Sequence, residues 1–129
     1  MENDNNKVVY KELSYKIMGV LFDINREVGF GYKEKFYEKA IAVGLKNKGI
    51  KFCRQVPYSV TFEGEVIGRH FLDFLIEDKI ILEIKAGNHF SRQNFSQVLE
   101  YLNTTNLKLA ILANFTPTGV KFKRVLNTY

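Results

Sequence analysis

Two apolar runs joined by a short polar turn, in residues 69–85, constrain the fold more than any other part of the chain. The segment reads RHFLDFLIEDKIILEIK, and residues 77–79 form the polar turn between the runs. Short apolar runs bounded by turn residues are typical of β-strands. The segment therefore predicts a β-hairpin in which residues 74–76 pair with residues 80–82.

Three charged residues interrupt these apolar runs, namely Asp73, Glu83 and Lys85. Burying an unpaired charge among apolar side chains costs free energy. Because side chains alternate between the two faces of a strand, Glu83 and Lys85 project to the same side, and the predicted pairing brings Asp73 beside Glu83. Carboxylate oxygens suit a hard cation such as Mg²⁺, and a nearby lysine can hold a water or a phosphate oxygen. The alternative is a solvated strand edge whose charges prevent aggregation.

The remaining segments alternate between helical and extended patterns. Apolar spacings of three and four predict helices, which are expected at residues 10–28, at residues 32–48 and from the cap Ser91 to about residue 103. Alternating or continuous apolar runs predict strands, which are expected at residues 52–62, from residue 66 into the hairpin, and at residues 108–115 and 120–126. This order predicts a single α/β domain over residues 1–129, with residues 1–9 as a frayed start.

The net charge, the cysteine count and the length of the apolar runs restrict the class of protein. A net charge of +5 is compatible with a polyanionic partner such as nucleic acid. The single cysteine, Cys53, excludes an internal disulfide and is interpreted as a small half-buried residue at the start of a strand. No apolar run approaches the length of a membrane span, and the polar segment 1–7 does not resemble a secretory signal. We therefore expect a cytoplasmic protein that does not enter a membrane.

Residues 31–37 read GYKEKFY, which is a G-x-x-E-x-x-Y motif. With Asp73, Glu83 and Lys85 matching an Asp…Glu-x-Lys pattern, the chain resembles the GxxExxY family, a branch of the PD-(D/E)XK nuclease superfamily. Further blocks that resemble this family lie at residues 13–17, 28–31, 37–41, 54–57 and 114–115. The resemblance implies an α/β fold with a restriction-endonuclease-like core, in which helices flank a central mixed β-sheet and the active site lies at a fork between strands.

The resemblance also implies roles for individual residues. Asp73 and Glu83 would bind Mg²⁺ or Mn²⁺ directly, and Lys85 would orient the attacking water and stabilise charge on the phosphate. A helix glutamate commonly completes such sites. Glu34 is the first choice as the catalytic outer metal ligand, with Glu38 second as its support.

Substrate contacts are expected outside this acidic group. Gln97 and Tyr101 match a Q-x-x-x-Y helix of RecB-like branches, although a polar residue and an aromatic at the edge of the core explain them equally well. Members often carry an arginine two residues before the strand aspartate. Here that position is Phe71, and Arg69 lies two residues further back with the same strand parity.

The roles of four other polar residues can each be interpreted in two ways. His89 is either a phosphate contact or a loop histidine without a role. Lys121, Lys123 and Arg124 either extend a basic surface along a nucleic-acid backbone or form a solvated terminal face.

These observations predict a metal-dependent phosphodiesterase, an endo- or exonuclease that hydrolyses nucleic acid with Mg²⁺ or Mn²⁺. DNA is favoured over RNA as its substrate, and a homodimer is left open. The alternative is a catalytically inactive module of the same fold that binds nucleic acid or protein. Clustered carboxylates near an apolar sheet are costly without a metal or substrate, which favours the enzyme.

Overall fold

One mixed β-sheet forms the centre of the computed structural model, which describes residues 9–127. Its strands lie in sequence order and are β1 (Phe52–Phe62), β2 (Glu65–Ile76), β3 (Ile80–Ala86), β4 (Leu109–Thr116) and β5 (Gly119–Leu126). Strands β3 and β4 run parallel, whereas the other neighbouring pairs are antiparallel. The predicted pairing of 74–76 with 80–82 is confirmed, and so is the fold class, a mixed sheet flanked by helices.

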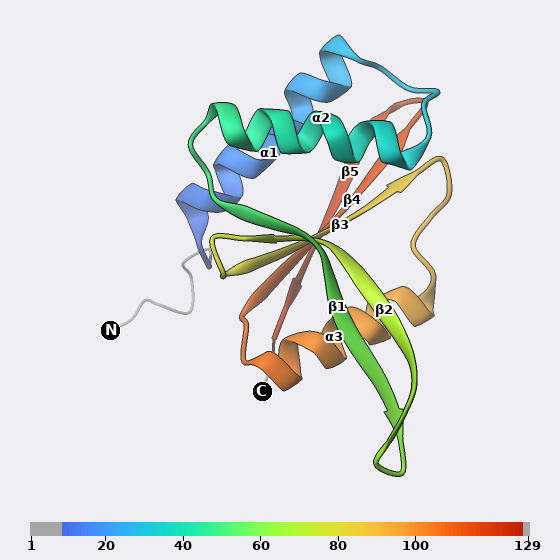
Figure 1. Ribbon diagram of the computed structural model, residues 1–129. Helices are drawn as coiled ribbons and strands as arrows, with labels where there is room; N and C mark the ends of the chain where they lie inside the picture. Colours follow the sequence, from blue (N-terminus) through green and yellow to red (C-terminus); the bar gives the residue numbers. More distant parts are fainter. Residues whose placement is uncertain (1–8, 128–129) are drawn as a thin grey trace.

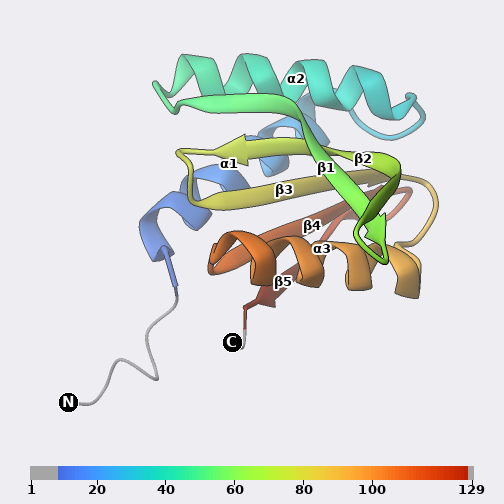
Figure 2. The same cartoon turned by 60° about the horizontal axis from the view of Figure 1, so that its bottom comes forward.

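Helices cover both faces of the sheet. They are α1 (Lys11–Glu27), α2 (Glu34–Asn47) and α3 (Arg92–Thr105). Figures 1 and 2 show α1 and α2 on one face and α3 on the other, so that the sheet is the middle of three layers. Ser91 caps α3 as expected, because its hydroxyl accepts a hydrogen bond from the Asn94 backbone N–H. No helix within residues 9–127 is long and apolar enough to cross a bilayer.

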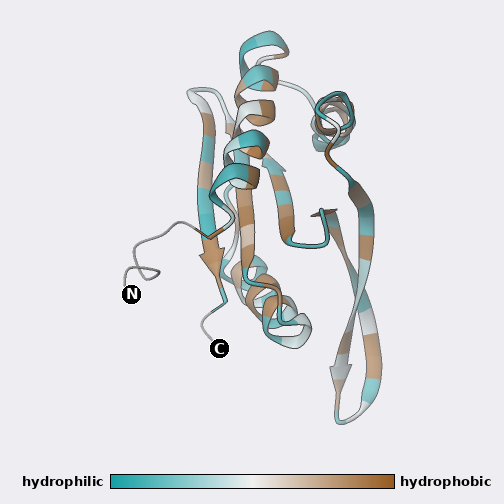
Figure 3. Cartoon of the chain, turned by 90° about the vertical axis from the view of Figure 1, so that its left-hand side faces the viewer, coloured by the Kyte–Doolittle hydropathy of each residue, from teal (hydrophilic) through white to brown (hydrophobic). Residues whose placement is uncertain are grey.

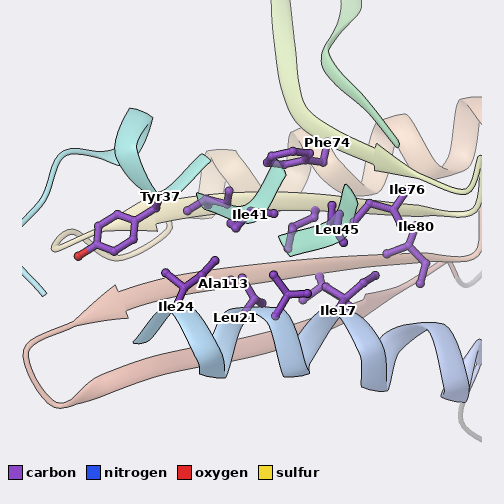
Figure 4. Packing of buried hydrophobic residues seen from close by; sticks show 14 of the residues in the cluster. Ile17, Leu21, Ile24, Tyr37, Ile41, Leu45, Phe74, Ile76, Ile80 and Ala113 are labelled. Carbon is purple, nitrogen blue, oxygen red and sulfur yellow. The ribbon is translucent and has the colours of Figure 1, made fainter. Parts of the chain in front are cut away.

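The larger core lies between the sheet and the α1–α2 pair. Figure 4 shows the α1 side chains Ile17 and Leu21 facing Ile41 and Leu45 of α2, with strand residues completing the cluster. The motif residue Tyr37 is fully buried there. Its ring stacks on Phe115 with centroids 4.2 Å apart, and its hydroxyl donates a hydrogen bond of 2.7 Å to the Gly29 carbonyl. Tyr37 therefore fixes α2 to both the sheet and the turn that follows α1.

A smaller core fills the space between the sheet and α3. Val98, Tyr101 and Leu102 of α3 pack there against Ile81 and Leu112 of the sheet. The two cores together cover both faces of β3 and β4, which explains why these strands read as nearly continuous apolar runs.

Strands β1 and β2 extend beyond the sheet as a two-stranded arm. β2 pairs with β3 over Phe74–Ile76, whereas it pairs with β1 along nearly its whole length. Figure 3 shows the arm leaving the body, with hydrophobic and hydrophilic residues alternating along it. The side chains of Phe62, Val66, Ile67 and Phe71 are exposed on it.

The elements agree with the sequence-based predictions to within a few residues at each end, with one local correction. Cys53 is exposed rather than half-buried, because it lies on β1, the edge strand of the sheet. Of the predicted frayed start, residues 1–8 lie outside the described residues.

Candidate active site

Two carboxylates meet where β2 separates from β3. The last paired residues before the separation are Phe74 and Leu82. Just beyond them, the Asp73 backbone N–H donates to Glu83 Oε2 at 2.7 Å, and the Ile84 backbone N–H donates to Asp73 Oδ2 at 2.8 Å. Each carboxylate thus replaces a strand-to-strand hydrogen bond at the fork, and this exchange fixes Asp73 and Glu83 side by side.

Burial and mutual repulsion act on this pair. Burial, together with the negative charges of Glu83 and Glu38, raises the pKa of Asp73 to about 8, although the Ile84 N–H opposes the shift. Burial also raises the pKa of Glu83, with the hydrogen bonds from Asp73 and the positive charge of Lys85 opposing the shift. The pair therefore retains a proton to a higher pH than two separate carboxyl groups would, because both negative charges are unfavourable in so small a buried space.

Glu38 approaches the pair from the other side of the fork. Its Oε1 accepts hydrogen bonds from Arg54 Nη2 at 3.2 Å and from Gln55 Nε2 at 3.0 Å. Gln55 has a left-handed backbone (φ 51°). It has no register partner on β2, although its neighbours Arg54 and Val56 pair with the residues on either side of Asp73. The irregularity in β1 turns this amide toward α2, and the two donors hold Glu38, whose side chain is 14% exposed, near the carboxylates.

Glu34 contacts a different part of the site. Its Oε1 accepts a hydrogen bond of 3.2 Å from the Ala86 backbone N–H, one residue after Lys85. Glu34 therefore ties the first turn of α2 to the end of β3. Both predicted helix glutamates border the fork, but the charge of Glu38 is the one that acts on Asp73 and Glu83.

Lys85 is half-buried on β3, two residues after Glu83. Strand alternation puts both side chains on the same face, as predicted. His70 also reaches this group, since its Nε2 lies 3.2 Å from Glu83 Oε1. Sequence reasoning assigned no site role to His70, Arg54 or Gln55. Residues 54–57 did match a family block, but the contacts depend on the irregular β1 backbone and the bend of β2 away from β3.

The three predicted substrate contacts lie on α3 and on β2. Tyr101 is 8% exposed within the smaller core, and its ring meets Tyr58 edge-on at 5.4 Å. Gln97 is half-buried one turn earlier on α3, and Arg69 is exposed on the arm. No hydrogen bond or ion pair among the described residues joins Gln97, Tyr101 or Arg69 to Asp73 or Glu83.

The donor set of the fork fits a hard divalent cation. Within residues 9–127 no group of three or more His, Cys, Asp or Glu side chains lies close enough to hold a metal ion. Mg²⁺ does not need such a group, because it is commonly bound by one or two carboxylates, with waters and substrate phosphates as the other ligands. Asp73 and Glu83 supply two carboxylates whose repulsion a cation would relieve.

Comparisons with known proteins show what the chain resembles in sequence and in fold. The sequence profile of the PD-(D/E)XK nuclease superfamily matches residues 11–125. The crystal structure of SSO0001 has a similar fold, with a TM-score of 0.53 and 17% sequence identity over 74% of this chain and 50% of that one. The chain thus spans about half the length of that protein. No curated protein sequence matches the chain.

Proposed function

Because the chain belongs to the PD-(D/E)XK nuclease superfamily, we propose that it hydrolyses phosphodiester bonds in nucleic acid with a divalent metal ion held by Asp73 and Glu83. The observation that carries the proposal is the reciprocal hydrogen bonding at the fork. Asp73 and Glu83 each have one oxygen fixed by the opposite strand, at 2.8 Å and 2.7 Å. Two carboxylates held rigidly together are suited to a cation and are unfavourable without one.

Mg²⁺ or Mn²⁺ bound at this position would neutralise charge on the phosphate and lower the pKa of a bound water. Asp73 and Glu83 would hold the ion, with Lys85 on the same face of the strand as Glu83. The Lys85 ammonium orients the attacking water and stabilises the charge that develops on the phosphate oxygens. Its position two residues after Glu83 on one strand supports this role, because both side chains then lie on the same face of the sheet.

The helix glutamates take separate roles in this proposal. Glu34 was the first choice from the sequence, but the contacts favour Glu38 as the outer ligand. The charge of Glu38 already acts on both carboxylates, and Arg54 and Gln55 hold its Oε1. Glu34 is proposed to fix the end of β3 through Ala86, and so to position Lys85.

The family branch, the substrate, the cofactor and the location of the protein are also proposals. The G-x-x-E-x-x-Y motif at residues 31–37 supports membership of the GxxExxY branch. DNA is the proposed substrate, and Mg²⁺ or Mn²⁺ the proposed cofactor. Gln97, Tyr101 and Arg69 remain candidate substrate contacts, a homodimer remains open, and the cytoplasm is the proposed location.

Cleavage of labelled single- and double-stranded DNA and RNA, with Mg²⁺, Mn²⁺ or a chelator, tests the function. We expect metal-dependent cleavage by the wild type and a loss of about 100-fold or more in Lys85→Ala, since a charge that stabilises the transition state is removed. Lys46→Ala, an exposed lysine near the end of α2, is the control and should retain activity. Metal-independent binding without cleavage of any of these substrates would instead support the inactive module.

A further inference from the structure

A small cavity lies one strand away from Lys85, on the α3 side of the sheet. Its volume is about 190 Å³. The residues that line it and matter here are His89, Phe90, Phe95, Asn114, Lys121 and Lys123. In the parallel β3–β4 pair, Asn114 is the register partner of Lys85. Register partners point to the same face of a sheet, and neighbouring strands are about 4.8 Å apart, so the cavity begins beside the catalytic lysine.

The chemistry of the cavity is cationic and aromatic. Lys121 and Lys123 are exposed on β5, and none of the described lining residues is acidic. The Lys123 Nζ lies 5.4 Å from the Phe95 ring centroid, and the Phe90 and Phe95 rings are tilted with centroids 6.3 Å apart. Lysines attract phosphate, and an aromatic face stacks on a nucleic-acid base whatever its sequence.

Asn114 places a polar atom without a hydrogen-bond partner in the described chain at the wall of this cavity. Its side chain is 7% exposed, and its Oδ1 accepts no hydrogen bond from any described residue. Buried polar groups are nearly always hydrogen-bonded, so an amide without a partner at a cavity wall calls for an explanation. Rotation about the last side-chain torsion exchanges oxygen and nitrogen with little change of shape, so either atom can face a ligand.

We propose that this cavity binds one nucleotide of the strand held at Lys85. The base packs on Phe95 and hydrogen-bonds to the Asn114 amide, and its phosphate lies against Lys121 and Lys123, with His89 at the rim. The volume is smaller than the roughly 300–1,000 Å³ usual for drug-sized ligands, which suits a single base. The inference rests on the proposed function for the identity of the strand, since the nucleotide bound here would neighbour the scissile phosphate.

Titration of ¹⁵N-labelled protein with a deoxynucleoside 5′-monophosphate, without metal, tests the site directly. We expect the amide signals of Phe95 and Asn114 to shift in a saturable way. Lys121→Ala/Lys123→Ala should weaken this binding by about tenfold, because two phosphate contacts are lost. The matched control Lys46→Ala/Lys51→Ala removes the same charge from exposed positions elsewhere and should change the affinity by less than about twofold.

Two further measurements can contradict the proposal. Asn114→Leu breaks no hydrogen bond within the described chain, so it should fold and yet bind the mononucleotide more weakly. Inorganic phosphate should bind more weakly than the mononucleotide, because it has no base to stack. Equal affinity for phosphate, or equal weakening in both lysine double variants, would overturn the proposal.

The proposed function and this site can fail separately. Mononucleotide binding needs no metal, so Asp73→Asn should bind the mononucleotide as the wild type does. A protein that binds the mononucleotide but never cleaves retains this site and contradicts the nuclease. A protein that cleaves, but whose cavity signals do not respond to the mononucleotide, contradicts this site alone.

Discussion

Asp73 is half-buried beside another carboxylate, and its negative charge works against the folded state when no cation is present. Burial and the charge of Glu83 raise its pKa from 3.8 to about 8. A carboxyl group with a raised pKa in the folded state stabilises the fold at a pH below its unfolded pKa. That contribution is lost as the pH rises through the folded pKa. Without metal, the protein should therefore lose stability between about pH 4 and pH 8.

Asp73→Asn should reduce this pH dependence, because an amide cannot ionise while its oxygen can still accept the hydrogen bond from Ile84. In the presence of a chelator at pH 8, we expect the variant to melt at the same temperature as the wild type or higher. Thermal unfolding at pH 5 and pH 8 measures both effects. A clear fall in melting temperature at pH 8 would mean that the Asp73 charge stabilises the fold as an ion-pair partner.

Glu34 and Glu38 can be distinguished by charge-removing substitutions. Glu38→Gln should lower metal affinity and cleavage by about tenfold or more, as the loss of a group that supports a metal site commonly does. Glu34→Gln should have a smaller effect on metal affinity, since Glu34 contacts the Ala86 backbone. Calorimetric titration with Mn²⁺ and cleavage rates are the measurements. The reverse order would return Glu34 to the role of outer ligand.

The sequence was informative about residues whose positions follow from strand alternation. Asp73, Glu83 and Lys85 could be grouped because one hairpin register fixes all three faces. Arg54 and Gln55 could not be assigned in this way, because the left-handed backbone of Gln55 breaks the alternation of β1. His70 reaches Glu83 only because β2 bends away from β3.

At the scale of the elements, α1 and α2 pack closely where a glycine of one helix meets a side chain of the other. A Cβ added at Gly44 would lie 2.6 Å from Val20 Cγ1, far inside ordinary contact. Valine is stiff in a helix and cannot easily turn away. The two helices would have to separate to accommodate a methyl group at this position.

Gly44→Ala should therefore destabilise the protein by about 1–3 kcal/mol through overpacking, less the gain in helix propensity. Gly19→Ala is the matched control, because Gly19 lies within α1 and an added Cβ would meet no described atom within 4 Å. That substitution should stabilise by about 0.5–1 kcal/mol, the usual difference between glycine and alanine in a helix. Urea unfolding of both variants checks the prediction, and equal effects of the same sign would contradict the close helix contact.

The elements themselves were largely predictable, because their signals are local. The β1 strand was predicted at its observed limits, and the cap Ser91 and the glycines around residue 30 indicated helix ends. What the apolar pattern did not show is why the predicted pairing of 74–76 with 80–82 stops at Phe74. The apolar pattern of residues 71–76 continues through the fork, and the separation is set by the carboxylates that replace the ladder hydrogen bonds.

At the scale of the whole molecule, three layers position one polar site. The α1–α2 pair carries Glu34 and Glu38 to the fork, the sheet carries Asp73, Glu83 and Lys85, and the α3 side adds the cavity at Asn114. The fold class followed from the order of elements and from the family resemblance. The arm did not, because the apolar pattern of β2 does not show where its pairing with β3 ends. The cavity did not, because its lining comes from several segments between His89 and Lys123.

The central claim is that Asp73 and Glu83 together bind a divalent metal ion, and calorimetric titration with Mn²⁺ tests it most directly. The wild type should bind the ion, and Asp73→Asn/Glu83→Gln should bind it at least about tenfold more weakly, because both carboxylate ligands are removed. The control Glu63→Gln/Glu65→Gln removes two exposed carboxylates at the tip of the arm and should bind as the wild type does. Equal affinity of the wild type and Asp73→Asn/Glu83→Gln would contradict the account.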